Sequence, residues 1–202
     1  MTELSTAPRV LPKGAVRVLG PDDQPLLRDH LLRLDPASRR DRFNGVVDDD
    51  FIIRYAASCF DDGVIVIGYI EAGEVHAAAE LHEPQRSLDK TPEIAFSVET
   101  HLRRNGVGSA LFKALLDEAR RAGYERLRVT TGAQNDAMRA LARKFGTRLV
   151  FRHGELSGSI ELAAANVPSP PLNPFETSRN IVRSVYALNR ALLNAFLGVR
   201  AG

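Results

Sequence analysis

Hydrophobic positions along the first hundred residues follow two different periods, which predict a mixture of helices and strands. Between residues 21 and 58, apolar residues recur every three or four positions behind acidic or proline-containing starts, which predicts three short helices. Runs of β-branched residues predict strands at 15–19, 64–70, 75–82 and 92–98. The polar sequence at 71–74 turns the second of these strands back into the third, as a hairpin.

The second half of the chain alternates helices and strands. Residues 106–122 give the clearest helix, because apolar and charged residues occupy opposite faces and Gly123 supplies a stop. A strand at 126–131, a helix at 135–145 and a closing hairpin of strands at 149–152 and 159–162 follow. We therefore expect one α/β (α+β) domain over residues 15–163, after a lead-in at 1–14.

Composition changes after residue 163. Four prolines predict a stiff linker at 164–176, and apolar residues at helical spacing predict an amphipathic helix at 177–202. We expect this helix to pack on the domain or to form a homodimer; binding to a membrane surface is a less favoured alternative. The chain has no secretory signal, no apolar run of the ~18 residues that a membrane span needs, and one cysteine, so we expect a cytoplasmic protein.

Charge is distributed unevenly although the formal net charge is only +2. Residues 1–100 carry 11 basic and 18 acidic side chains, whereas residues 101–152 carry 12 basic and 4 acidic ones. The basic block predicts a polyanionic partner such as nucleic acid, or a smaller anion. The five histidines are scattered without metal-ligand spacing, so we expect no metal.

A glycine-containing turn connects the strand at 92–98 to the helix that begins at 106. Its sequence is Arg103-Arg104-Asn105-Gly106-Val107-Gly108. Free N–H groups at the start of a helix bind anions, and glycine lets a phosphate approach the backbone closely. The spacing differs from G-x-G-x-x-G and from G-x-x-x-x-G-K-[ST], which argues against a dinucleotide or a nucleoside triphosphate.

Residues 93–111 resemble the GNAT superfamily, the GCN5-related N-acetyltransferases. The family's R/Q-x-x-G-x-G/A motif is met at Arg103, Gly106 and Gly108, and residues 135–146 resemble its second cofactor motif. The resemblance implies the GNAT fold: a mixed, mostly antiparallel sheet with splayed central strands and helices on both faces. It also implies acetyl-CoA as co-substrate, which gives the basic block a role without nucleic acid.

In this fold the turn's amides hold the CoA pyrophosphate, and the pantetheine arm lies in the gap between the two splayed strands. The residues that the resemblance assigns to the cofactor are Phe96, Ser97, Val98, Arg103, Arg104, Asn105, Gly106, Val107, Gly108, Ser109 and Asn135.

The chain departs from the family at two places. Most relatives carry glycine where Arg104 stands and a basic residue where Asn105 stands. Many also have a tyrosine that protonates the departing thiolate, whereas this chain has Ala142 there.

Glu93 is the candidate general base, because acetyl transfer to an amine needs a proton acceptor. It resembles the glutamate that acts through water in the histone-acetyltransferase branch and in bacterial protein lysine acetyltransferases. A solvent-facing glutamate at a strand edge is the alternative. Glu80, His82 and Glu83, at the end of the preceding strand, could reach the same cleft.

These features predict an N-acetyltransferase in which a primary amine attacks the thioester directly. The acidic N-terminal half favours a cationic acceptor. Residues 17–19 and 34–43 resemble the start of the bacterial protein lysine acetyltransferase domain, which favours a protein lysine. A polyamine-like or aminoglycoside-like amine and a non-catalytic acyl-CoA sensor are the alternatives.

Overall fold

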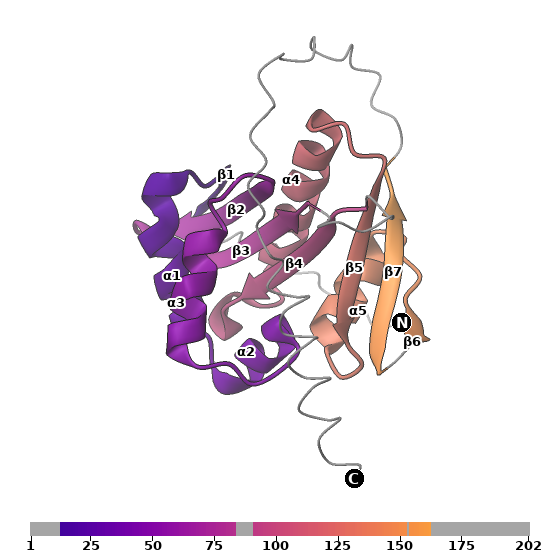
Figure 1. Cartoon of the computed structure of the whole chain (residues 1–202), viewed down its shortest axis with the longest axis horizontal. Helices are drawn as coiled ribbons and strands as arrows, with labels where there is room; N and C mark the ends of the chain where they lie inside the picture. Colours follow the sequence, from indigo (N-terminus) through magenta and orange to yellow (C-terminus); the bar gives the residue numbers. More distant parts are fainter. Residues whose placement is uncertain (1–12, 84–90, 153, 163–202) are drawn as a thin grey trace, which may run out of the picture.

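The computed structural model describes residues 13–83, 91–152 and 154–162. These residues form a seven-stranded sheet with the order β1-β2-β3-β4-β5-β7-β6 and with helices on both faces (Figure 1). The predicted linker at 164–176, the C-terminal helix and its homodimer contact lie outside the described residues. Among the helices that the structure describes, none has the length and apolar character needed to span a bilayer.

The order of elements agrees with the periodicity of the sequence. The strands are β1 (Ala15–Val18), β2 (Val64–Glu71), β3 (Glu74–His82), β4 (Glu93–Val98), β5 (Arg126–Gly132), β6 (Val150–Arg152) and β7 (Glu155–Glu161). The α-helices are α1 (Gln24–Arg33), α2 (Pro36–Phe43), α3 (Asp49–Ser58), α4 (Val107–Arg121) and α5 (Asp136–Lys144). Two short 3₁₀ turns, η1 (Pro21–Asp23) and η2 (Thr100–Leu102), precede α1 and the glycine-containing turn.

The last strand is longer than the sequence predicts. β7 begins at Glu155 rather than at residue 159, and it pairs with β5 along its whole length. Gly158 lies inside the strand, where a Cβ would come within 2.6 Å of the Arg148 carbonyl oxygen. The glycine is therefore there for close backbone approach rather than for a turn.

The two central strands separate after a short parallel contact. β4 pairs with β5 only at Glu93↔Arg128 and Ile94↔Val129, whereas every other pair of neighbouring strands is antiparallel. The rest of β4 stays paired with β3 alone. The predicted mixed, mostly antiparallel sheet with splayed central strands is confirmed.

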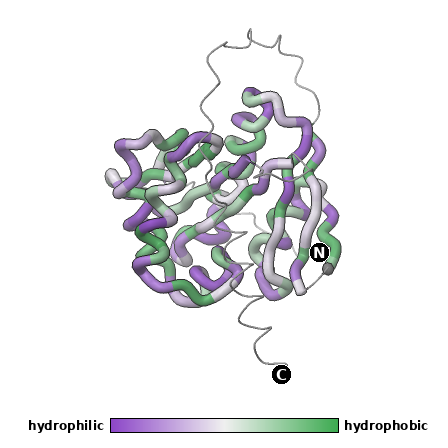
Figure 2. Tube along the Cα trace, viewed as in Figure 1, coloured by the Kyte–Doolittle hydropathy of each residue, from purple (hydrophilic) through white to green (hydrophobic). Residues whose placement is uncertain are grey.

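Two hydrophobic cores hold the helices on the sheet. On one face, fully buried Leu27, Leu31 and Ile52 anchor α1 and α3. On the other face, Leu111 and Leu115 anchor α4. Hydrophobic and hydrophilic stretches alternate along the helices (Figure 2). Burial of each of these leucine side chains contributes roughly 1.5–3 kcal/mol to the stability of the fold.

α2 lies over the place where β4 and β5 separate, and it contacts both strands. Its first turn is capped by the Asp35 carboxylate, which accepts from Ser38 N at 2.9 Å. Its end is closed by Asn44 in the left-handed conformation, and the Asn44 side-chain amide donates to Glu155 on β7. The helix thus bridges the gap from the β4 side to the β7 side.

A buried ion pair joins α2 to the sheet. Glu80 is fully buried on β3, and its Oε2 accepts from Arg42 Nη2 at 2.5 Å, from the Tyr55 hydroxyl and from His82 Nε2 at 3.0 Å. Burial favours the neutral acid, but the Arg42 charge and the His82 hydrogen bond outweigh it and hold the pKa of Glu80 below its usual range. The carboxylate therefore stays ionised and holds α2, α3 and β3 together.

We predict that Glu80→Gln destabilises the domain by about 3–5 kcal/mol, because it leaves the Arg42 charge buried without its counter-charge. Urea denaturation followed by circular dichroism measures the change. The matched control is Glu161→Gln, which breaks the exposed Arg126–Glu161 pair and should cost under about 1 kcal/mol. Equal losses in the two variants would contradict a structural role for the buried pair.

Candidate active site

The turn between β4 and α4 presents a row of free backbone amides. Gly106 caps α4 with a φ of 88°, and the first helical hydrogen bond runs from Ala110 N to Gly106 O at 3.0 Å. The amides from Arg104 to Ser109 have no backbone acceptor in the described part of the chain. Together with the positive end of the α4 dipole they form a site for an anion.

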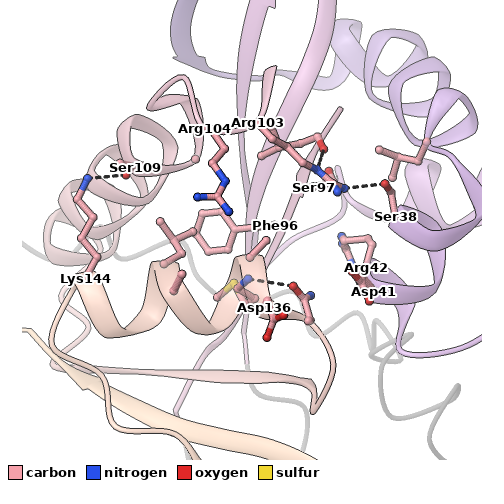
Figure 3. A pocket seen from close by; sticks show the side chains of 18 of the residues that line it. Ser38, Asp41, Arg42, Phe96, Ser97, Arg103, Arg104, Ser109, Asp136 and Lys144 are labelled. Atoms are coloured by element: carbon pink, nitrogen blue, oxygen red, sulfur yellow. Dashed lines mark hydrogen bonds between the residues drawn. The ribbon is translucent and has the colours of Figure 1, made fainter. Parts of the chain in front are cut away.

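Arg104 adopts the left-handed conformation, with a φ of 64°. This conformation costs a non-glycine residue roughly 1–2 kcal/mol, which explains why glycine is common at the corresponding position of relatives. The turn thus keeps the backbone shape that glycine favours while adding a guanidinium. Figure 3 shows the Arg104 side chain extending over the pocket.

A pocket of about 640 Å³ begins at this turn and extends along β4. It lies between α2 on one side and the start of α4 and the length of α5 on the other. Its lining consists of Leu34, Ser38, Asp41, Arg42, Phe96, Ser97, Val98, Arg103, Arg104, Gly106, Gly108, Ser109, Asn135, Asp136, Ala137, Met138, Ala140, Leu141 and Lys144.

Most of the residues expected at the cofactor line this pocket, but three of the predicted site residues do not. Val107 is buried in the core beneath the turn. The Asn105 side chain turns back to the His101 carbonyl oxygen at 3.5 Å. Glu93 is half-buried at the start of β4, opposite His82 on β3 and Arg128 on β5.

Arg103 points away from the place expected for the phosphates. Its Nη2 donates to Ser38 Oγ at 2.6 Å, and its Nε donates to the Val98 carbonyl oxygen (Figure 3). Ser38 in turn donates to Asp35, whose pKa is lowered by the hydrogen bonds from Ser38 and Thr100. Arg103 therefore ties the turn to the start of α2.

Lys144 and Asn135 place α5 against the anion site. Lys144 Nζ lies 2.8 Å from Ser109 Oγ (Figure 3), so α5 adds a cation that the sequence marked only as part of a motif. Asn135 caps α5, because its Oδ1 accepts from Met138 N at 2.9 Å. Its Nδ2 has no acceptor in the described ranges.

A stack of three aromatic rings supports β4 from the α4 side. The ring centroids of Phe96 and Phe112 are 5.1 Å apart, and those of Phe112 and Phe145 are 4.1 Å apart, with nearly parallel planes. Phe96 thereby lines the pocket with an apolar surface that suits a pantetheine arm.

The edge of β4 that faces the gap carries backbone N–H and C=O groups that are not paired with a neighbouring strand. Pro92 O accepts from Arg128 N at 2.7 Å on the β5 side, whereas Glu99 N donates to His76 O on the β3 side. Since backbone groups alternate in direction along a strand, those of Phe96 and Val98 face the gap. The Val98 carbonyl oxygen accepts from Arg103 Nε, which leaves the two backbone groups of Phe96 and the N–H of Val98 to pair with an extended ligand as a strand would.

Ser97, one of the residues that line the pocket, belongs with its hydroxyl to a buried network. His30 on α1 is fully buried, with Nε2 at 2.8 Å from Ser97 Oγ and Nδ1 at 3.1 Å from Glu99 Oε1. Burial lowers the pKa of His30, only partly opposed by Glu99. Burial raises the pKa of Glu99, but hydrogen bonds from His30 and His76 and the Arg33 charge outweigh it, leaving a pKa of about 2.

Glu99 also brings together one group of possible metal ligands in the described part of the chain. Its Oε2 lies 3.1 Å from His76 Nδ1 and 3.7 Å from His101 Nδ1. The spacing of these three residues in the sequence did not indicate the group, because the residues come together only when β3 lies beside the segment that follows β4. Arg33 binds the other carboxylate oxygen, and its charge opposes a cation there.

The fold and the site define a class of protein. Residues 26–147 match the model of the acetyltransferase (GNAT) family. The chain belongs to this family, whose co-substrate is acetyl-CoA.

Three solved structures illustrate the likeness. The GNAT domain of S. lividans PAT is 20% identical, with a TM-score of 0.64 over 74% of this chain and 90% of that one. A GNAT superfamily phosphinothricin acetyltransferase from Sinorhizobium meliloti, in complex with acetyl-CoA, is 15% identical, with a TM-score of 0.59 over 84% and 100%. A ribosomal-protein-alanine N-acetyltransferase from Brucella melitensis is 21% identical, with a TM-score of 0.57 over 73% and 99%.

We predict that Gly106→Glu abolishes CoA binding in isothermal titration calorimetry. The new carboxylate would stand among the amides that we expect to receive the pyrophosphate, and it would repel the phosphates. Gly123→Glu is the matched control: Gly123 also has a positive φ, of 83°, and open space for a side chain, but it lies at the far end of α4. CoA affinity retained in Gly106→Glu would contradict the placement of the phosphate site.

Proposed function

We propose that this chain transfers the acetyl group of acetyl-CoA to a cationic primary amine, with the side chain of a protein lysine as acceptor. The observation that supports this proposal best is the shape of the pocket. It runs from the amide row of the turn, along the unpaired edge of β4, to the acidic side chain of Asp41 on α2.

The cofactor has a place in this arrangement. The pyrophosphate receives hydrogen bonds from the amides between Arg104 and Ser109, with Arg104 and Lys144 supplying positive charge. The pantetheine arm lies along Phe96 and Val98, in the gap that β5 leaves. Asn135 faces the arm from the start of α5.

The acceptor approaches from the α2 side. Asp41 is exposed and lines the pocket, and the surrounding N-terminal half carries most of the chain's acidic residues. A carboxylate at this position attracts an ammonium group and raises its local concentration. The likeness to a ribosomal-protein-alanine N-acetyltransferase supports a protein as the acceptor.

Glu93 receives the proton that the ammonium group must lose. Its side chain is on the same face of β4 as Ser97, because two residues in a strand share a face when an even number of positions separates them. Four residues of strand, about 13 Å, separate the two. At this separation the proton would have to reach the carboxylate through water.

The experiment that tests the function is release of free thiol from acetyl-CoA in the presence of lysine peptides, polyamines or an aminoglycoside. We expect turnover to be highest with the lysine peptides, and mass spectrometry should find the acetyl group on the lysine side chain. Stabilisation of the protein by CoA without turnover on any amine would instead support an acyl-CoA sensor.

We predict that Glu93→Gln lowers kcat by ~10²–10⁴-fold, the range usual for loss of a general base, while the affinity for CoA stays within about twofold. Glu118→Gln, on the exposed side of α4 away from the pocket, is the control and should keep full activity. A loss of less than about fivefold in Glu93→Gln would remove Glu93 from the mechanism.

We predict that Asp41→Asn raises KM for a lysine peptide by roughly fivefold, the effect of about 1 kcal/mol, with kcat unchanged. The rise in KM should be smaller in 0.5 M salt, because at about that ionic strength charges are screened over a few ångströms. Asp50→Asn, an exposed acid in the first turn of α3, should leave KM unchanged. An equal rise in both variants would mean that Asp41 makes no specific contact with the acceptor.

A further inference from the structure

A histidine on β3 lies directly beside the proposed base. His82 of β3 pairs with Glu93 of β4, and the two strands lie side by side in the sheet (Figure 1). Directly opposite residues of an antiparallel pair carry their side chains on the same face, with Cβ atoms roughly 4.5–5.5 Å apart. At that spacing a proton can pass between the imidazole and the carboxylate, either directly or through one water molecule.

The neighbour of Glu93 on the other side cannot take up a proton. Glu93 pairs there with Arg128 of β5. A guanidinium has donors but no acceptor, and it stays charged in proteins. Of the two residues that pair with Glu93 in the sheet, His82 is therefore the one with a nitrogen lone pair.

Buried Glu80 fixes the tautomer of His82. Glu80 is ionised beside Arg42, and an ionised carboxylate only accepts hydrogen bonds. His82 Nε2, which lies 3.0 Å from Glu80 Oε2 and 3.2 Å from the Tyr55 hydroxyl, therefore carries the proton that Glu80 accepts. Nδ1 of the neutral imidazole is then the proton acceptor, and it has no hydrogen-bond partner within the described ranges.

His82 also connects the buried cluster to solvent. Its side chain is 18% exposed, whereas that of Glu80 is fully buried. A proton that reaches His82 can thus leave to water. While the imidazolium exists, the Glu80 carboxylate stabilises it, as a buried carboxylate does for the histidine of a catalytic triad.

We propose that His82 is a relay residue, which accepts from Glu93 the proton taken from the amine and releases it to solvent. This inference rests on the acetyl transfer and on the role of Glu93 proposed above. His82 acts through Glu93 rather than on the acceptor itself, and direct attack of the amine on the thioester is unchanged.

The proton count of the reaction requires such an exit. An ammonium acceptor has three N–H bonds and the amide product has one, so two protons leave the nitrogen for each acetyl group transferred. One ends on the sulfur of CoA, whose bond to the acetyl carbon breaks as the carbon–nitrogen bond forms. The other passes through Glu93 to His82 Nδ1 and then to water, which returns the carboxylate to its ionised form for the next turnover.

The test compares two substitutions of His82 at saturating acetyl-CoA and lysine peptide. His82→Gln keeps an amide that can donate to Glu80 but cannot take up a proton, so kcat should fall by at least about tenfold. His82→Ala should lose at least as much, and added imidazole should restore its kcat in proportion to the imidazole concentration. His82→Gln should not respond to imidazole, because the glutamine side chain fills the space.

A role confined to the hydrogen bond with Glu80 predicts a different result. His82→Gln would then keep kcat within about twofold of the unmodified chain, and imidazole would not help His82→Ala. Both variants should stay folded, because Glu80 keeps its bonds to Arg42 and Tyr55. Urea denaturation and CoA calorimetry check this, with an affinity for CoA within about twofold of the unmodified chain.

His76→Ala is the matched control. His76 also lies on β3, is 17% exposed and bonds a glutamate, with Nδ1 3.1 Å from Glu99 Oε2, but it is near the opposite end of the strand from His82. This variant should keep its kcat within about twofold, with or without imidazole.

The relay and the proposed function fail in different ways. If the unmodified chain releases no thiol with any amine, the acetyl transfer itself is wrong. If it acetylates the lysine peptide and Glu93→Gln loses activity, but His82→Gln keeps its kcat and His82→Ala ignores imidazole, the relay is wrong. Glu93 then passes its proton to solvent without His82.

Discussion

The separation of β4 from β5 is the constraint on which the rest of this molecule depends. Backbone N–H and C=O groups in the middle of a sheet need partners, and β4 loses its partners on the β5 side after Ile94. The aromatic stack behind Phe96 and the bridge of α2 from β4 to β7 keep the gap from closing. The vacant edge is therefore available to a ligand that can bond like a strand.

The charges around this gap are arranged by element. The α4 and α5 side carries Arg104 and Lys144 at the proposed anion site, together with the acid Asp136, whereas α2 contributes Asp41. Arg103 and Arg42 also line the pocket, but their guanidinium groups are bonded within the protein, Arg103 to Ser38 and Arg42 to Glu80. Within the basic block, Arg103 thus fastens α2, and Arg104 and Lys144 are the cations that we propose for the phosphates. From the acidic half, Asp41 is the exposed carboxylate in the pocket.

Local patterns predicted the elements because periodicity and caps act over a few residues. The turn at 103–108 follows from the same short-range chemistry. Asn135, which the resemblance assigned to the cofactor, also caps α5 in the structure. The orientation of Arg103 could not be predicted, because it depends on Ser38, 65 residues away. The Glu80 cluster and the hydrogen-bonded row through His30 likewise bring together residues from separate elements. In the sequence, only His30, a histidine among the leucines of α1, indicated that this apolar face meets a polar partner.

Burial explains why such a row would be kept. A fully buried imidazole costs free energy unless both of its nitrogens are bonded, and here one bond goes to a carboxylate and the other to a hydroxyl in the pocket. A hydrophobic residue at position 30 would pack in α1 without that requirement. The polar row therefore has a cost that packing alone does not demand, and it ties α1 to β4 at Ser97, in the part of the strand that β5 leaves unpaired.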